Sequence, residues 1–222
     1  MEQSFAVIDQ EIGEHNFSPA EYAIVRRVIH STADFEFKQL IRFSPGAIEA
    51  GITALRRRIP IVTDVGMVKQ GVAGLVTQTF GNPVISAVEQ SPVALPGKTR
   101  TETGLLQCWK EFPAAIFVIG NAPTALLALC DQLPPARQFA QAPGPSHAIG
   151  SPVSPALVIG APVGFISVVE SKAALAYTPV HQIRVEGRKG GSAVAAAILN
   201  ALIVLAWEEE LFLQQGEQGE LS

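Results

Sequence analysis

His30 is the residue of this 222-residue chain best suited to acid–base chemistry. Histidine exchanges protons near neutral pH, and Arg27 precedes His30 by one turn of a predicted helix, so both side chains can face the same space. A cationic Arg27 disfavours a protonated imidazole, whereas Asp34, one turn further on, favours it. The spacing therefore predicts a proton donor or acceptor at His30, although a lone helical histidine also fits a structural role.

Three glycine-containing turns are typical of sites for anionic ligands. In 117–124 and again in 157–164, an apolar run ends in Gly and a helical pattern follows. A third turn, 187–192, adds the positive charges of Arg188 and Lys189. Helix starts present free backbone N–H groups, which favour anions. These turns predict a ligand with negative charges, held where strands end.

Three further segments carry polar side chains with two interpretations each. Thr99 and Arg100 precede a helix, where backbone donors and a guanidinium could share a carboxylate, or Thr99 could simply cap the helix. Asp64, at the end of a strand, could serve a ligand or cap the residues near Met67. The segment 170–172 (Glu-Ser-Lys) fits a site or a solvated helix face equally well.

Several classes of chemistry lack their sequence signals. The chain has no P-loop lysine pattern, dinucleotide-type glycine fingerprint, nucleophile elbow or metal-binding helix. Cys108 and Cys130 lie inside apolar helical patterns, without zinc-ligand spacing or a disulfide framework. The net charge of −4 gives no general reason for nucleic-acid binding. We therefore expect no metal site, no nucleotide cofactor and no nucleic-acid partner.

The elements that position these residues alternate between strands and helices. Ser18 and Glu21 form a capping-box pattern around Pro19, which predicts a helix from about Pro19 to about Ser31. Strands are predicted at 61–64, 84–88, 115–119, 156–159 and 181–185, and further helices from about 44, 99, 124, 167 and 192. This alternation predicts an α/β fold with a mainly parallel sheet of about five strands, flanked by helices on both faces. Right-handed crossovers then place the turns on one rim.

Residues 1–211 are expected to form a single domain. A Pro-rich inserted loop is predicted at 134–155, and a flexible tail at 212–222. The apolar run 193–207 is interrupted by Asn200 and is too short to span a membrane comfortably, so it predicts a buried helix. With two cysteines and no leader pattern, the chain is expected in a reducing cytoplasm, without a membrane partner.

The ordered set of motifs resembles that of the precorrin-8X methylmutases, which include the cobalt-precorrin-8 methylmutases. The shared segments are Ser4–Phe5, Arg27–His30, Phe43–Pro45, Asp64 with Met67–Val68, Lys98–Arg100, Ile119–Leu126, Pro162–Phe165, Glu170–Lys172 and Gly190–Ala193. The resemblance extends from about Ser4 to Ala201. It implies a homodimeric α/β isomerase of cobalamin biosynthesis that moves a methyl group from C11 to C12 of a corrinoid tetrapyrrole.

The resemblance also implies roles for particular residues. His30 matches the proton donor or acceptor, and Ser4, Arg27 and Arg100 match substrate-contacting positions. With the three turns, the remaining expected substrate-binding residues are Thr99, Gly120, Asn121, Thr124, Gly164, Gly190, Gly191 and Ser192. An intramolecular methyl shift needs no cofactor and no external methyl donor. The alternative from another class is a non-catalytic corrinoid carrier, which would use the same residues but would not need His30; a nucleotide-dependent transferase is a second rival.

Overall fold

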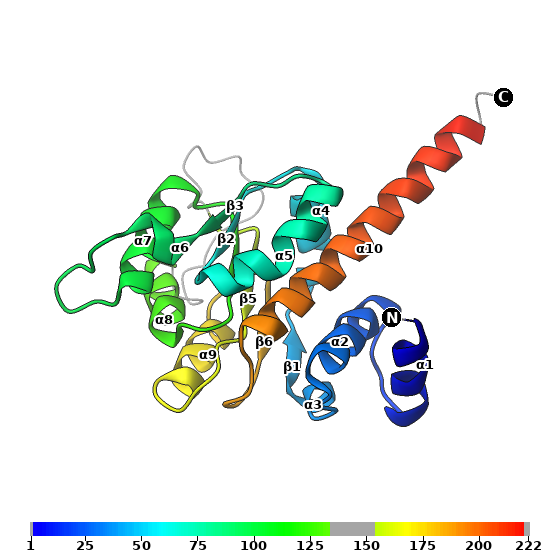
Figure 1. Ribbon diagram of the computed structural model, residues 1–222, viewed down its shortest axis with the longest axis horizontal. Coiled ribbons are helices and arrows are strands. Elements are labelled where there is room, and N and C mark those ends of the chain that lie inside the picture. Colours follow the sequence, from blue (N-terminus) through cyan, green and yellow to red (C-terminus); the bar gives the residue numbers. More distant parts are fainter. Residues whose placement is uncertain (1, 134–153, 220–222) are drawn as a thin grey trace, which may run out of the picture.

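A six-stranded sheet forms the centre of the computed structural model, which describes residues 2–133 and 154–219 (Figure 1). Its strands are β1 (Ile41–Phe43), β2 (Ile61–Thr63), β3 (Val84–Ser86), β4 (Ile116–Ile119), β5 (Leu157–Gly160) and β6 (Gln182–Val185), in the order β1-β6-β5-β4-β2-β3. β1 pairs with β6 antiparallel, and the other neighbours pair parallel. The predicted mainly parallel sheet is confirmed, with the short edge strand β1 added to the five expected.

Helices cover both faces of the sheet. One layer contains α2 (Pro19–Thr32), α4 (Ala47–Arg56), α5 (Gly66–Gln78) and α10 (Ser192–Gly219), with α1 (Glu2–Glu11) and α3 (Phe37–Leu40) packed on α2. The other contains α6 (Ala87–Gln90), α7 (Arg100–Glu111), α8 (Pro123–Gln132) and α9 (Val168–Ala176). Side chains of β4 alternate between the layers: Ile116 and Val118 join the first core, Phe117 and Ile119 the second. The predicted α/β architecture is thus confirmed.

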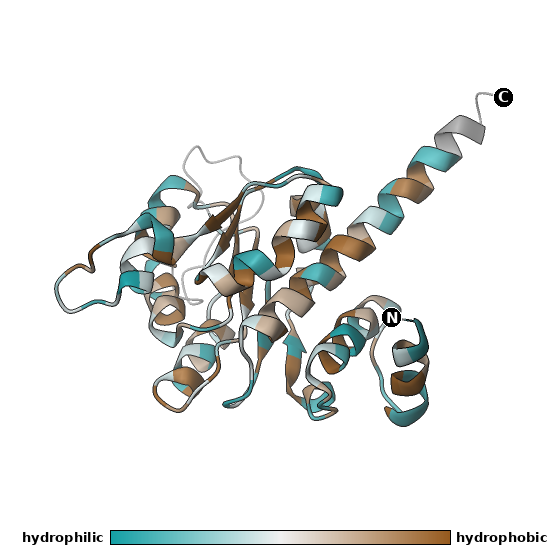
Figure 2. Cartoon of the chain, viewed as in Figure 1, coloured by the Kyte–Doolittle hydropathy of each residue, from teal (hydrophilic) through white to brown (hydrophobic). Residues whose placement is uncertain are grey.

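Helix α10 crosses the first layer, and its C-terminal part extends away from the sheet (Figure 1). α2 and α5 both pack against it, and hydrophobic colouring gathers on the strands and the inner part of α10 (Figure 2). Within the described residues, Ser192–Gln215 is long and apolar enough to cross a membrane, but 56% of its apolar window is buried inside the protein. The buried helix predicted over 193–207 is confirmed, and it continues beyond that segment to Gly219.

Local capping signals explain why the helices that carry the candidate residues start where they do. Ser18 caps α2 and Thr99 caps α7, each within a complete capping box. The helix expected from Ser44 begins instead at Ala47, because Gly46 adopts a left-handed conformation and serves as its N-cap. The predicted strand 84–88 ends at Ser86. Apart from Ser154 and Pro155, the predicted loop 134–155 lies outside the described residues.

Candidate active site

The three glycine turns meet at the carboxyl ends of the parallel strands, as predicted. A Cβ atom at Gly120 would lie 2.9 Å from Ser192 Cα, so the turn after β4 touches the start of α10. The backbone N–H of Gly191 donates to the Ala161 carbonyl over 2.8 Å, and that of Gly164 donates to the Arg188 carbonyl over 3.2 Å. We refer to residues 187–192 as the third turn. These contacts join the segments after β4, β5 and β6 into one rim.

Gly190 is the position in the rim that tolerates a side chain least. A Cβ atom there would lie 2.3 Å from the Ala161 oxygen and 2.6 Å from the Pro162 oxygen, and φ is +157°. We expect Gly190→Ala to lower the free energy of unfolding by about 3 kcal/mol, measured by urea titration. Gly187→Ala is the matched control, since Gly187 also has positive φ (+71°) but open space around it. Its expected loss is about 1 kcal/mol, and equal losses in both variants would contradict the packing argument.

Asp64 occupies the backbone donors of the turn after β4, which corrects the expectation that these N–H groups are free. Its carboxylate is fully buried and accepts hydrogen bonds from the backbone N–H groups of Gly120 (3.1 Å), Asn121 (2.6 Å) and Ala122 (2.7 Å). A fourth comes from Val65 N–H at 3.0 Å. Burial raises the pKa of Asp64, and the four donors oppose that rise. Asp64 therefore binds the turn rather than capping the residues near Met67.

Lys172 is the complementary group on the other side of the rim. Its side chain is buried, not on a solvated face, and Nζ donates to the carbonyl oxygens of Gly187 (2.9 Å) and Lys189 (2.7 Å). Burial lowers the pKa of Lys172 to about 8. The amphipathic pattern of the sequence gave no sign of this burial. Each of two turns is thus held by a buried charged side chain. The Asp64 carboxylate accepts from backbone N–H groups of the turn after β4, and the Lys172 ammonium donates to backbone carbonyls of the third turn.

His30 lies on α2 and is exposed, and its ring meets the Phe5 ring edge-on, with centroids 5.3 Å apart. Ser4 precedes Phe5 on α1 and is also exposed. Arg27 lines a cavity of about 130 Å³ between α1, α2 and α10, together with Phe5 and Glu208. Burial is the main cause that lowers the pKa of Arg27, and the nearby positive charge of Arg26 lowers it further. The negative charge of Glu208 acts in the opposite direction. Phe5 therefore contacts the His30 ring and also lines the cavity that contains Arg27.

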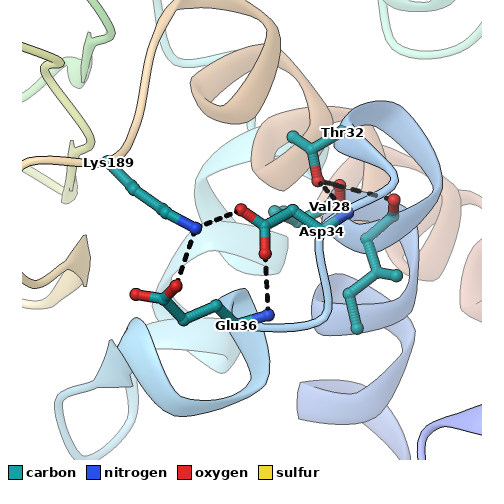
Figure 3. Close-up of polar contacts among 6 residues, drawn as sticks. Val28, Thr32, Asp34, Glu36 and Lys189 are labelled. Atoms are coloured by element: carbon teal, nitrogen blue, oxygen red, sulfur yellow. Dashed lines mark hydrogen bonds and ion pairs between the residues drawn. The ribbon is translucent and has the colours of Figure 1, made fainter.

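Lys189 ties the end of α2 to the third turn (Figure 3). Its ammonium donates to a carboxylate oxygen of Asp34 at 2.5 Å and to one of Glu36 at 2.7 Å. The hydrogen bond from Lys189 lowers the pKa of Asp34. The structure therefore pairs Asp34 with Lys189, whereas the sequence suggested an influence on His30. This ion pair connects the segment that follows α2, the helix that carries His30, to the third turn.

Thr99 and Arg100 lie on the side of the rim formed by α7 and α8. The Thr99 hydroxyl oxygen caps α7 and lies 3.3 Å from that of Thr124, so the capping interpretation of Thr99 is confirmed. Arg100 is exposed, and its guanidinium donates to the backbone oxygens of Ser91 and Val88, both at 3.2 Å. Those two bonds orient the guanidinium.

Exposed apolar side chains flank the same rim, a feature for which the sequence analysis gave no role. Phe165 and Ile166, directly after Gly164, are 85% and 84% exposed, and Met67 after β2 is 74% exposed. The Arg188 guanidinium lies 5.7 Å from the centre of the Phe165 ring. The only sequence signal was two large apolar residues between Gly164 and a helix start. The rim therefore offers apolar surface next to positive charge, which suits a flat, carboxylate-edged ligand.

A family model described as "Precorrin-8X methylmutase" matches residues 1–205. The chain belongs to the precorrin-8X methylmutase family. It is 53% identical to a cobalt-precorrin-8 methylmutase of Synechocystis sp., over 93% of this chain and 95% of that protein. It is 36% identical to a precorrin-8X methylmutase of Pseudomonas aeruginosa, over 90% and 91% of the two chains. The chain is similar to the crystal structure of the Thermus thermophilus precorrin-8X methyl mutase, with a TM-score of 0.78 and 42% sequence identity. The match covers 94% of this chain and 97% of that protein.

Membership of the precorrin-8X methylmutase family makes the chain a methylmutase, an isomerase of cobalamin biosynthesis. The activity predicted from the motifs is therefore confirmed at that level, and the chain is a soluble biosynthetic enzyme. The matched region contains every residue that the sequence analysis assigned to the site, from Ser4 to Ser192.

Proposed function

We propose that the glycine rim and the exposed face of α2 bind precorrin-8X or cobalt-precorrin-8, and that His30 exchanges a proton with the macrocycle while a methyl group moves from C11 to C12. The product is hydrogenobyrinate or its cobalt-containing counterpart. The observation that carries the proposal is the exposed His30 imidazole on a helix that Lys189 and Asp34 tie to the rim. A proton-transfer group must be accessible to its substrate, and the exposure of His30 supports this role.

In this proposal the substrate carboxylates are held mainly by side chains. Arg100 and Arg27 bind carboxylates, and Ser4, Thr99, Asn121 and Thr124 add polar contacts. The small residues Gly164, Gly190, Gly191 and Ser192 line the rim that meets the ring, whereas Gly120 is buried against Ala195 and Ser192 and shapes the rim from inside. Because Asp64 already accepts the N–H groups of residues 120–122, that turn contributes shape rather than anion-binding donors. Phe165 and Ile166 supply apolar contact for the ring.

The reaction suits this set of residues. A carbon-to-carbon methyl shift within one molecule requires the macrocycle to be held still and one proton to be placed well. A positioned acid or base contributes about 10² to 10⁴ in rate. The rest comes from orientation and from charges aimed at the reacting region. Any cobalt belongs to the substrate, so the protein itself needs no metal ligands for it.

The test is turnover by the purified protein. We expect the absorption spectrum of the substrate to change to that of the product with no added nucleotide or methyl donor. Both substrates should be supplied, beginning with cobalt-precorrin-8, because the 53%-identical relative is named for it. A non-catalytic carrier would bind the tetrapyrrole and leave it unconverted, and that result would overturn the proposed catalytic role of His30.

We further propose that the enzyme acts as a cytoplasmic homodimer. Support for a second copy comes from the part of α10 that extends away from the sheet, where Leu211, Phe212 and Leu213 are 39%, 76% and 53% exposed. Two free cysteines, Cys108 and Cys130, suit a reducing compartment. Sedimentation velocity should give twice the mass of the chain, and a monomer at micromolar concentration would contradict the dimer.

A further inference from the structure

Lys172 is a buried cation whose hydrogen-bond partners are backbone oxygens of the third turn. The residue is 2% exposed, and Nζ donates to the Gly187 and Lys189 carbonyls at 2.9 and 2.7 Å. Among the residues that the structure describes, Lys172 has no carboxylate partner. A buried ammonium without an anion is costly to the fold, so a neutral side chain would serve packing better. The cost indicates that Lys172 does something beyond packing.

The third turn that Lys172 holds is connected to two other parts of the site. Gly191 N–H donates to the Ala161 carbonyl and Gly164 N–H to the Arg188 carbonyl, which link the turn to the segment after β5. The Lys189 side chain links the turn to Asp34, at the end of the helix that carries His30. A shift of this turn would therefore move the glycine rim and the His30 helix relative to each other.

We infer that Lys172 is a positioning residue for the methyl shift, because it holds the third turn in the place against which the tetrapyrrole binds. Lys172 acts through the backbone of that turn and does not touch the substrate. The inference rests on the proposed role of the third turn in substrate binding. Small displacements of a rim that orients a substrate are costly, since about 1 Å of misplacement can reduce a rate by about 10²-fold.

The protonation of Lys172 gives this role a pH signature. Its pKa is lowered to about 8, so the folded protein loses this proton as the pH rises through about 8. A neutral amine makes weaker hydrogen bonds than an ammonium, so the third turn loosens and kcat/KM should fall above about pH 8. Between about pH 8 and the ordinary value of 10.5, the unfolded chain binds more protons than the folded one. The Lys172 contribution to the free energy of unfolding therefore rises over the same interval.

Other charged or titratable groups surround Lys172 and must be separated from it. They come from the shared cavity beside β6, from the third turn and from α9 itself: Tyr177, Arg184, Glu186, Arg188, Lys189 and Glu170. Arg184 pairs with Glu186 at 3.3 Å, and Lys189 pairs with Asp34 and Glu36. All of these groups remain in a Lys172→Met variant, so a difference between that variant and the wild type belongs to Lys172.

The experiment compares the pH profiles of wild type, Lys172→Met and Ser171→Ala. Ser171 is a matched control because it is buried on the same helix and donates to the Val168 carbonyl within α9, away from the third turn. We expect Lys172→Met to lower kcat/KM at pH 7 by about 10- to 100-fold. We also expect the variant to lose the fall in kcat/KM above about pH 8, which is the alkaline limb of the profile. Ser171→Ala should retain the limb and the wild-type kcat/KM, whatever its stability.

The outcomes separate this inference from the proposed function. Wild-type turnover together with an unchanged kcat/KM and an unchanged limb in Lys172→Met overturns the inference alone. Absence of turnover by the wild type overturns the proposed function and the inference with it. If Lys172→Met fails to fold, the test uses the wild type alone. The inference then requires that the kcat/KM of the wild type falls above about pH 8 while its free energy of unfolding in urea does not fall in parallel. Activity that stays level, or that falls only together with stability, overturns the inference.

Discussion

Replacing His30 with alanine is expected to lower the rate of methylmutase turnover by about 10²- to 10⁴-fold and to leave the fold intact. The rate falls because the variant has no group at this position to exchange a proton with the macrocycle. The fold persists because His30 is exposed and its ring contact is the edge-on approach to Phe5. The rate is measured from the appearance of the product's absorption spectrum, and the fold by circular dichroism and urea titration.

His181→Ala is the matched control for His30→Ala. His181 is also exposed, but it precedes β6 at the end of the sheet opposite the glycine rim, where its ring lies 3.2 Å from the Pro45 carbonyl oxygen. Its replacement should leave turnover at the wild-type rate. Binding of the product by His30→Ala, followed by its change in absorbance, should remain close to wild type, since the residues proposed to bind its carboxylates are kept. Formation of product by His30→Ala at the wild-type rate would reject the assignment.

Replacing Asp64 with alanine is expected to destabilise the protein by about 3 to 5 kcal/mol. The carboxylate accepts four backbone hydrogen bonds in a buried position, and alanine leaves those N–H groups without their partner. Each buried donor without an acceptor costs about 1 to 3 kcal/mol, with part of that cost relieved if water enters. Urea titration measures the loss, and turnover should fall as well because the turn after β4 is part of the rim.

Asp64→Asn is the informative comparison, because it keeps the shape of the side chain. One amide oxygen can still accept from the turn, but the NH₂ group faces backbone donors and cannot accept from them. We therefore expect a loss of stability between those of the wild type and Asp64→Ala. If Asp64→Ala unfolds at the same urea concentration as the wild type, the buried carboxylate is not what holds the turn.

The sequence was most informative where the interacting groups are close along the chain. The capping box at Ser18 joins residues three positions apart, so its pattern located the start of α2, and Thr99 was recognised as a possible cap of α7. The strand β1 was missed because its pairing is antiparallel and depends on β6, far along the chain. Local signals therefore predicted the five parallel strands and six of the helices, but not the antiparallel edge strand β1 or the helices α1, α3, α5 and α6.

The sequence proposed a set of site residues, but it did not predict several of the contacts that these residues and their neighbours make. The sequence placed Asp64 at a strand end, but its partners at Gly120 to Ala122 are supplied by a turn more than fifty residues later. Lys172 followed an ordinary helical pattern, and its burial depends on carbonyl groups of Gly187 and Lys189 beyond the next strand. Both contacts form between a side chain and backbone groups that are far apart in the sequence. A pattern in a single sequence does not encode such pairs.

The two internal charges, Asp64 and Lys172, make the order of their turns independent of any ligand. In many anion-binding loops the ligand itself satisfies the backbone donors, and the loop becomes ordered only when the ligand arrives. Here Asp64 and Lys172 satisfy the backbone groups of their turns without any ligand. These two turns should therefore be as rigid in the free protein as in a complex, and little conformational entropy should be lost in them on ligand binding.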